Sequence, residues 1–332
     1  MTRFVLGRVL AAIGVLIVLV VAVFSLQRVS DADPVRADLG PSATEEVVAA
    51  QRAELGYDDP IPTQVVRYLG QVMQGDLGES IRTDQPVSDD LRRALPATLE
   101  LIAFAMSVAV LGGVALGVLT TKVGRRTGSV RGSMTAMNAV PPFLIAIVGV
   151  LVFSRTLGWL PISGRTQFLD APTEPTGFMT IDGLLAGRLD VAWDAVMHMI
   201  VPAVALSIAP MVAIARVLRM SLLSVQDSDY VRTARSKGIG SRRVLVRHSL
   251  RNAAGPALSL TGLLLAGMFA GAVVVEQIVA WPGVGAYLLR SIQSSDYPSI
   301  AGVTIVIGLA FVLVNAAVEV VQRLMDPRMS AS

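Results

Sequence analysis

The chain has 332 residues, of which 53% are hydrophobic and 16% charged, and its mean hydropathy of +0.62 is that of a membrane protein. A nucleic-acid partner is excluded, because the net charge of +3 forms no basic face with stacking aromatics, which make up only 5% of the chain. Without cysteine there are no disulfides and no thiol chemistry. His198 and His248 lie far apart with no third ligand, so no metal site is expected.

Six stretches are long and apolar enough to cross a bilayer as helices. A hydrocarbon core about 30 Å thick requires about 20 apolar residues in helical form, because unpaired backbone groups are costly in lipid. The expected spans are Phe4 to Leu26, Pro96 to Thr121, Met134 to Leu157, Val196 to Leu218, Pro256 to Val279 and Ser299 to Val321. The first run is too long for a signal peptide, and no Ala-x-Ala cleavage site follows it. The expected fold class is an all-α integral membrane protein.

Charges in the connections predict the orientation of these spans. Residues 122–133 carry four basic residues and no acid, and residues 216–255 carry nine basic residues against two acids, which indicates cytoplasmic loops. Residues 27–95 carry thirteen acids against seven basic residues, residues 155–195 carry five against three, and residues 281–298 are nearly uncharged. These three segments are expected outside. Cytoplasmic and outer segments alternate along the whole chain if both termini are cytoplasmic. This arrangement requires an even number of spans.

The long first outer segment has the pattern of folded helices. Ser42 with Glu45 predicts a capping box for a helix over 43–55, which ends near Gly56. A second helix is expected over 63–73. Its apolar stripe would consist of Val65, Leu69, Val72 and Met73. This helical segment either packs against the membrane bundle or docks an external partner.

The sequence contains no nucleotide-binding motif and no catalytic motif. Neither lysine, Lys122 or Lys237, stands in a phosphate-binding loop, so any ATP would be hydrolysed by another chain. An ion-coupled carrier tends to place ionisable groups at the bilayer midplane. The candidates are Glu100, Glu276 and Glu319, which fall towards the ends of their spans. No Ser-His-Asp or paired-carboxylate arrangement can be built within the spans, so no catalytic residue is expected.

The connection over residues 227–241 predicts a helix, a sharp turn and a second helix. Asp227 or Ser228 would cap the first helix, Gly238 would end it in a left-handed conformation, and Ser241 would cap a helix through Leu250. Its charges suit the helix dipole, with Asp229 in the first turn and Arg235 and Lys237 in the last. Tyr230, Val231 and Ala234 form a narrow apolar face. Such a pair either rests on anionic lipid or inserts into a groove of a soluble partner.

Two fragments of this connection resemble the EAA loop of binding-protein-dependent ABC permeases, in its oligopeptide/dipeptide version. The fragments are residues 230–238 (YVRTARSKG) and 247–256 (RHSLRNAAGP). Arg232, Thr233 and Ala234 stand where the general motif has Glu-Ala-Ala, and Gly238 and Pro256 match its glycine and its closing proline. Gly255 departs from the larger apolar residue that usually precedes that proline.

Shorter fragments extend the resemblance over nearly the whole chain, in the family's order. They are 58–62 with 75–80, 96–101, Phe153 with 157–164, Glu276 with 281–285, 296–298 and 326–328. Each fragment alone is weak, but their order makes the match strong.

The resemblance implies the six-helix fold of a type I importer permease and a division of the chain. The first helix would cover 1–30, an extracytoplasmic helical segment 31–95, a five-helix core 96–324 with its coupling loop at about 219–256, and a cytoplasmic tail 325–332. The ATPase-coupling residues would be Asp229, Tyr230, Val231, Arg232, Thr233, Ala234, Arg235, Lys237, Gly238 and Pro256. Trp159, Pro161, Glu276, Trp281, Pro282, Gly283 and Gly285 would form the outer gate or the docking site of the binding protein, although Trp159 and Trp281 also suit interfacial anchoring.

The same resemblance implies the partners and the mechanism. In a bacterial cytoplasmic membrane, this chain would assemble with a homologous second permease, two ABC ATPase subunits that use ATP and Mg²⁺, and an extracytoplasmic substrate-binding protein. It would bind no cofactor itself, and closure of the ATPases would drive alternating access for a peptide. Pro141, Pro142, Pro202 and Pro210 could bend the third and fourth spans, while Gly112, Gly113 and Gly117 could allow close packing. Nickel or glutathione import, an ion-coupled carrier and a membrane-anchored scaffold stay as alternatives.

Overall fold

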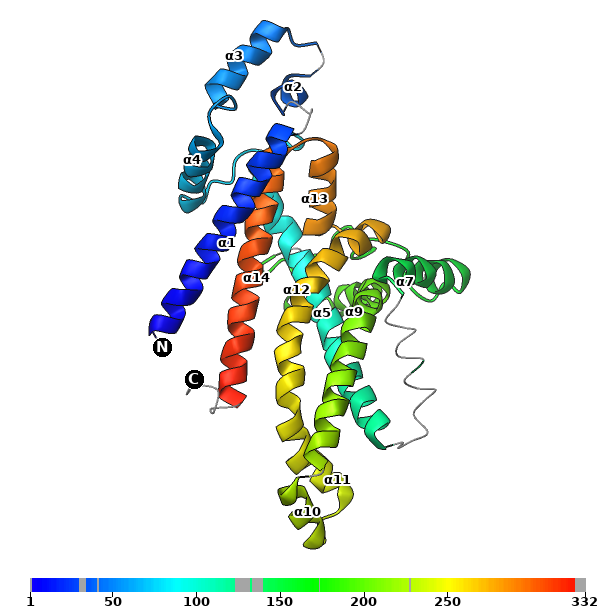
Figure 1. Cartoon of the computed structure of the whole chain (residues 1–332). Coiled ribbons are helices and arrows are strands. Elements are labelled where there is room, and N and C mark those ends of the chain that lie inside the picture. The colour runs from blue at the N-terminus through cyan, green and yellow to red at the C-terminus, as the bar shows by residue number, and fades with distance from the viewer. Residues whose placement is uncertain are drawn as a thin grey trace. The chain divides into compact units, whose positions relative to one another are not determined.

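The computed structural model describes residues 2–29, 34–40, 42–122, 132, 140–172, 174–226 and 228–325 (Figure 1). Over these residues the regular structure is helical, with one isolated β-bridge between Glu79 and Pro86. The chain divides into two compact units. The first comprises Met1–Thr98, Pro175–Gly177 and Pro282–Leu313, and the second comprises Leu99–Glu174, Phe178–Trp281 and Val314–Ser332.

Four described helices have the length and apolar composition needed to cross a membrane. They are Val87–Thr121, Leu189–Gln226, Arg251–Ile278 and Tyr297–Ala317. Two shorter apolar stretches, Ile13–Ser25 and Pro142–Thr156, lie within the two remaining predicted spans. Each predicted span therefore overlaps an apolar helix of the structure, and four of these helices have full crossing length.

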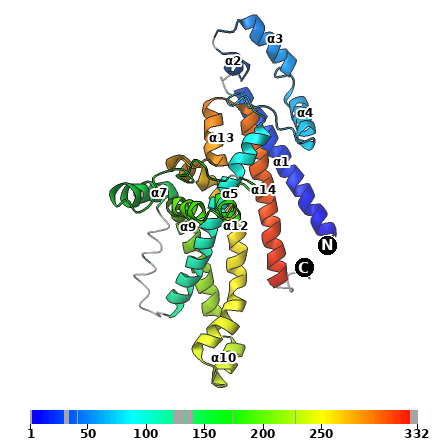
Figure 2. The same cartoon turned by 180° about the vertical axis from the view of Figure 1, so that it is seen from behind.

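In the first unit, α1 (Thr2–Val29) lies beside the first part of α14 (Tyr297–Met325) in both cartoon views (Figures 1 and 2). Helix α4 (Ile61–Met73) packs against both. Their shared core consists of Val20, Val23, Val65, Tyr68, Ala301 and Ile305. Gly308 allows the close approach, because a Cβ at this position would lie 2.9 Å from Leu19.

The outer helical segment is present, but its boundaries and its capping differ from the prediction. Helix α2 (Pro34–Leu39) was not predicted, and α3 (Glu45–Leu55) follows Thr44 without a side-chain cap. The capping box at Ser42 is wrong, because the Glu45 carboxylate instead pairs with Arg36. The end of α3 is as predicted, with Gly56 left-handed at φ +71°.

Helix α4 also departs from the expected pattern at its two ends. It begins at Ile61, two residues before the predicted Thr63, because Pro62 is tolerated in the first turn. At the other end Met73 is 89% exposed and does not belong to the buried stripe, unlike Val65 at 5%.

The rest of the first unit contains a helix that the sequence did not reveal. Helix α13 (Val284–Gln293) packs with the start of α5 (Val87–Lys122) and with α14. Helix α5 begins at Val87, before the predicted Pro96, and continues through that proline. The Thr98 hydroxyl on α5 accepts a hydrogen bond from the Val284 N–H at 2.8 Å, so α5 supplies the cap for α13.

In the second unit, α9 (Leu189–Gln226) and α12 (Arg251–Ile278) lie side by side (Figures 1 and 2). The remainder of α5 approaches α9 closely at Gly113, where a Cβ would lie 2.8 Å from Ile214 and 2.9 Å from the Met211 carbonyl oxygen. The expectation that small residues allow close helix packing is confirmed there. Helix α9 remains one helix through both of its prolines.

The third span has a different start from the predicted one at Met134. Helix α7 (Pro142–Gly149) begins at Pro142, with Pro141 extended before it, and continues into the π-helix η2 (Val150–Thr156). The proline pair therefore starts this helix rather than bending it, because Pro142 lacks the N–H that the first turn leaves unused. Residues 134–139 lie outside the described residues.

Candidate functional site

The predicted coupling hairpin forms one small structure, which we call the knob (residues 228–250). It contains α10 (Asp229–Ser236), α11 (Ser241–Arg243) and the π-helix η3 (Val244–Leu250). Gly238 has φ +76°, as predicted. The Gly238 N–H donates to the Arg235 carbonyl at 2.9 Å and the Ile239 N–H to the Ala234 carbonyl at 3.2 Å. This pair of bonds is a Schellman motif, which requires the left-handed residue and fixes the direction of the turn.

The apolar face of α10 is used inside the knob. Val231 is 0% exposed and Ala234 7% exposed, and both pack against Val244 with Val225 and Ile239. Tyr230, by contrast, is 42% exposed. The predicted narrow face of three residues is therefore two buried residues and one exposed ring, and Val231 and Ala234 hold the shape of the knob.

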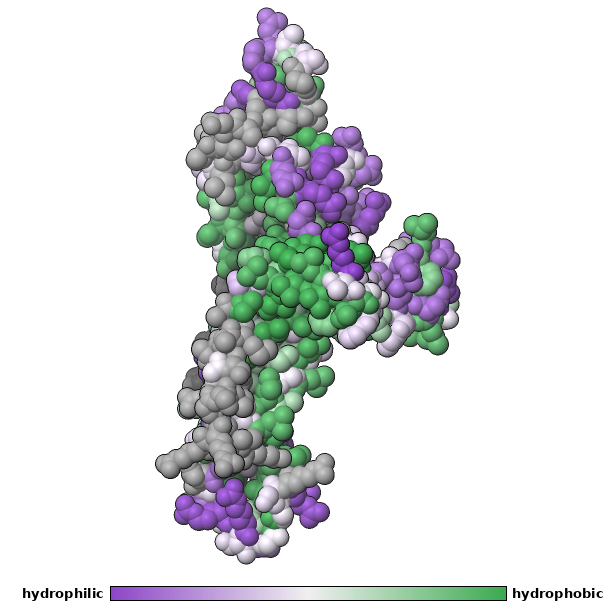
Figure 3. Space-filling view, turned by 90° about the vertical axis from the view of Figure 1, so that its right-hand side faces the viewer, coloured by the Kyte–Doolittle hydropathy of each residue, from purple (hydrophilic) through white to green (hydrophobic). Residues whose placement is uncertain are grey.

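Polar side chains cover the outside of the knob. Arg232, Thr233, Arg235, Ser236 and Lys237 are all exposed. In Figure 3 hydrophilic side chains gather at the lower tip, where α10 lies, among neutral ones and a few hydrophobic ones. The Arg232 to Asp229 ion pair is long, at 3.5 Å, and open to solvent, so it contributes little to stability. The exposed cations are therefore available to an external partner.

The knob connects directly to the membrane helices on either side. Ser228 precedes α10 in an extended conformation, and its hydroxyl donates to the Val225 carbonyl at 2.5 Å instead of capping α10. Asp227, the other predicted cap, lies outside the described residues. The second helix is preceded by Gly240, not capped by Ser241, and continues through η3 into α12 without a break. Pro256 lies within α12 and not in the knob.

One hydrogen bond joins the outside of α10 to α12. The Asn252 amide donates to the Tyr230 hydroxyl at 2.9 Å. This contact bypasses the turn, since the two residues lie on either side of it. A displacement of α10 would therefore reach α12 both through η3 and through this bond.

A second cluster surrounds Glu100, a residue considered for ion coupling. Its carboxylate is 6% exposed and pairs with Arg165 at 2.6 Å. It also accepts the backbone N–H groups of Met179 at 3.2 Å and Thr180 at 2.8 Å, which begin α8 (Met179–Leu185), and the Thr180 hydroxyl. A carboxylate at a helix N-terminus is favourable, and four donors leave this one fully occupied. Glu100 therefore joins α5, the loop at Arg165 and α8.

The Arg165 guanidinium also lies over Trp281, 5.8 Å from the ring centroid. Trp281 is 1% exposed, so it is not an interfacial anchor, and its backbone N–H donates to the backbone carbonyl of Glu276 at 2.8 Å. Between them the chain is strained, because Ala280 is left-handed at φ +47°. The predicted gate residues Glu276 and Trp281 are thus close together and buried, and Trp281 contacts Arg165 in a loop that no local sequence pattern connects to it.

The other predicted gate residues lie elsewhere. Trp159 is 69% exposed and touches Phe153, with ring centroids 6.1 Å apart, which fits an interfacial anchor. The Pro161 carbonyl accepts the Ser154 hydroxyl at 2.8 Å. Both belong to the second unit, whereas Pro282, Gly283 and Gly285 belong to the first. The seven residues therefore do not form one cluster within either unit.

Beside Pro282 and Gly283, the first unit has a hollow of about 160 Å³ with three arginines around it. They are Arg82, Arg93 and Arg290. None of them forms an ion pair with another described residue, and Asp90 is the only acid lining the hollow. The Arg82 guanidinium lies 5.5 Å from the centroid of Tyr287. Three guanidinium groups beside one carboxylate give the hollow an excess of positive charge, which favours carboxylate ligands.

A buried hydrogen-bond network in the first unit was not predicted from the sequence. Asp296 is fully buried and accepts the hydroxyls of Ser80 at 2.6 Å and Ser299 at 2.7 Å. The Tyr287 hydroxyl shares a hydrogen bond with Ser299 at 2.7 Å. Burial raises the pKa of Tyr287 and keeps its hydroxyl protonated. The only trace in the sequence was that the fragments around Ser80 and Asp296 both resembled family motifs.

Comparison with known proteins identifies relatives along the whole chain. Residues 109–331 match the family described as binding-protein-dependent transport system inner membrane component, and residues 1–102 match the N-terminal model of the same group. The dipeptide transport system permease protein DppB of Alkalihalophilus pseudofirmus is 34% identical over 99% of both chains. The probable D,D-dipeptide permease DdpB of Escherichia coli is 36% identical over 97% of this chain and 94% of its own. The di/tripeptide permease DppB of Pseudomonas aeruginosa is 38% identical over 92% of each.

Proposed function

Since the chain belongs to the family of binding-protein-dependent transport system inner membrane components, we propose that it transports short peptides inward, as one half of a permease pair. The observation that carries the substrate class is the full-length similarity to three permeases whose names specify dipeptides or di/tripeptides. The family match and the four long apolar helices support a multi-pass inner-membrane subunit. We expect this subunit to have no catalytic residues. Nickel and glutathione are the competing cargoes.

The proposed topology has six spans with both termini in the cytoplasm. Four full-length apolar helices and two shorter ones at the predicted places support the number of spans. The distribution of arginine supports the orientation, because residues 216–255 carry nine basic residues against two acids. The proposed division of the chain into segments is the one predicted from the sequence, namely 1–30, 31–95, 96–324 and 325–332.

Energy would enter at the knob. ATP and Mg²⁺ would be bound by two separate ATPase subunits. A cleft in the ATPase subunit that contacts this chain would hold α10. The rigid Schellman turn, the buried Val231 and Ala234 and the exposed cations support this role, because a lever needs a fixed shape and a polar outer surface. The coupling set stays as predicted, with Asp229 to Arg235, Lys237 and Gly238 in the knob and Pro256 in α12.

The extracytoplasmic binding protein would dock near Pro282 and Gly283. The arginine-lined hollow beside them supports this location, because carboxylates on a partner would compensate Arg82, Arg93 and Arg290. Trp159, Pro161, Glu276, Trp281 and Gly285 remain candidates for the outer gate. Glu276 and Trp281 are the strongest of these, since they are buried beside the strained Ala280.

The test is reconstitution of the complete transporter in liposomes with its second permease, its ATPases and its binding protein. Labelled dialanine should accumulate inside only when ATP and the binding protein are both present. The same vesicles should be offered nickel and glutathione. Uptake of either of these in preference to dialanine would refute the peptide assignment, and uptake by this chain alone would refute the role of a coupled subunit.

A further inference from the structure

Helix α4 (Ile61–Met73) has three sides of different character. One turn of an α-helix takes about 3.6 residues, so residues three and four positions apart share a side. Val65, Tyr68 and Val72 lie on the first side and pack with α1 and α14. The second side is polar, and the third is apolar and exposed. Packing onto the two long helices therefore uses only one side of α4.

The first side places α4 at the depth of the membrane. It packs with Ala301 and Ile305, in the first half of the stretch Tyr297–Ala317, which is long and apolar enough to cross a bilayer. It also packs with Val20 and Val23, near the end of the apolar stretch of α1. Because all four residues lie towards one end of these stretches, α4 lies at a boundary between membrane and water.

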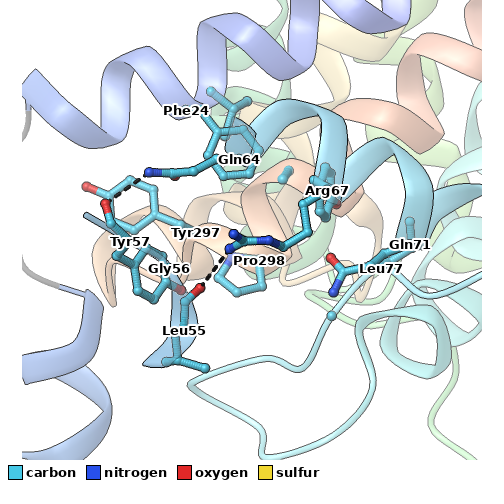
Figure 4. A pocket seen from close by; sticks show the side chains of 14 residues that line it. Phe24, Leu55, Gly56, Tyr57, Gln64, Arg67, Gln71, Leu77, Tyr297 and Pro298 are labelled. Atoms are coloured by element: carbon cyan, nitrogen blue, oxygen red, sulfur yellow. Dashed lines mark hydrogen bonds between the residues drawn. The ribbon is translucent and has the colours of Figure 1, made fainter. Parts of the chain in front are cut away.

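The second side of α4 faces the turn that follows α3 (Figure 4). The Arg67 guanidinium donates to the Leu55 carbonyl at 3.4 Å and pairs with Asp59. The Gln64 amide donates to the carbonyls of Tyr57 at 2.9 Å and Asp59 at 2.7 Å. This side is therefore occupied by polar parts of the same chain.

The third side, which we call the apolar flank, consists of Pro62, Val66, Leu69 and Met73. These residues have the i, i+4, i+7, i+11 spacing of one side of a helix, and none of them is charged. Val66 is 71% exposed and Met73 89% exposed, Pro62 is also exposed, and Leu69 is partly buried. Apolar side chains gathered on one exposed surface mark a site of contact with a membrane or a protein.

We propose that the apolar flank of α4 inserts among the acyl chains of membrane phospholipids, so that α4 is an interfacial helix. Such a helix buries its apolar face about 5–10 Å into the boundary between headgroups and acyl chains and keeps its polar face in water. The three sides of α4 meet this requirement, because the membrane helices take one side, the polar turn takes the second and the apolar flank is left for lipid.

Two observations favour lipid over a protein partner on the apolar flank. The neighbouring α1 exposes Val18 by 67% and Val21 by 38% within its own apolar stretch, so the flank continues a surface that lipid covers. A stable protein interface takes about 20–30 residues from each partner, whereas the flank offers Pro62, Val66 and Met73 as exposed side chains. The proposed topology decides on which side of the membrane α4 lies, but the contact with lipid does not depend on it.

Fluorescence quenching in lipid nanodiscs tests the proposal on the assembled transporter without peptide or ATP, so its outcome is independent of the peptide assignment. The chain has no cysteine, so Val66→Cys and Met73→Cys each introduce one site for a fluorophore, and the wild-type chain gives the background from the partner subunits. Both probes should lose most of their fluorescence in brominated phosphatidylcholine and little of it with aqueous iodide. Two exposed control positions, Thr63→Cys on the polar side of α4 and Val47→Cys on α3, should show the reverse.

Other outcomes overturn the proposal in distinct ways. Quenching of both flank probes by iodide alone would place the flank in water. Protection from both quenchers in the assembled transporter would mean that the second permease covers the flank. Iodide quenching that disappears when the binding protein is added would assign the flank to that partner. Equal quenching of the Val47 probe by brominated lipid would show that the flank differs in no way from the rest of the outer segment.

Discussion

The knob and the Glu100 cluster are built in opposite ways. The knob is held by neighbours in sequence, through a Schellman turn and the Val231 and Ala234 contacts, and its charges face outward. The Glu100 cluster is held by residues far apart in sequence, and its charges are buried, with Arg165 65 positions away. The difference predicts that substitutions in the cluster should affect stability first, whereas substitutions on the knob should affect transport first.

Glu100→Ala should have the largest effect on stability. It leaves Arg165 buried without its carboxylate and removes an acceptor from the start of α8, so the free energy of unfolding should fall by about 3–5 kcal/mol. Chemical denaturation of the solubilised protein measures this. The double variant Glu100→Gln/Arg165→Gln should recover part of the loss, since the uncompensated charge is gone. A wild-type transition for Glu100→Ala would show that the cluster does not hold the fold.

Gly238→Val should have the next largest effect, on transport as well as stability. A β-branched residue at φ +76° costs about 1–2 kcal/mol or more, with no steric clash, because nothing lies within 4 Å of the position. Peptide uptake by the reconstituted transporter should be lost while the protein stays in the membrane. Gly238→Asn should retain most uptake, because asparagine tolerates the left-handed conformation.

The matched control for this prediction is Gly240→Ala. Gly240 has an ordinary φ of −58° and no neighbour within 4 Å, so uptake should be unchanged. If Gly238→Val transports at the wild-type rate, the knob does not transmit force through its turn.

Ala280→Gly should have a smaller effect of opposite sign. The substitution relieves the left-handed strain beside Trp281 but adds freedom to the unfolded chain, so stability should rise by no more than about 1 kcal/mol. Thermal unfolding of the purified protein measures it. Ala257→Gly, within α12, is the control and should lower stability by about 1 kcal/mol. A destabilised Ala280→Gly would mean that the left-handed conformation of Ala280 is not strained.

The same contrast explains which features could be predicted from sequence. The left-handed Gly238 and the apolar helices were predicted because glycine spacing and hydropathy act over neighbouring residues. The contacts of Glu100 with Arg165 and of Asp296 with Ser80 were missed, because no local pattern connects residues so distant. Local reasoning failed at Ser42, where Arg36 took the Glu45 carboxylate that the capping box required. Helix α13 was missed because it is short and follows a Pro-Gly turn.

Arg232→Ala should have the smallest effect on stability. It distinguishes most clearly between a residue that acts in transport and one that stabilises the fold. Its ion pair with Asp229 is 3.5 Å long and exposed, so its loss should change the free energy of unfolding by less than about 0.5 kcal/mol. If α10 is gripped by an ATPase, however, the lost cation should lower peptide uptake per ATP hydrolysed. Arg92→Ala is the matched control, because Arg92 forms the same exposed i,i+3 pair with Asp89 at 3.4 Å in the first unit. Equal uptake by the two variants would show that the outward charges of the knob have no special role, and would leave its shape alone to account for coupling.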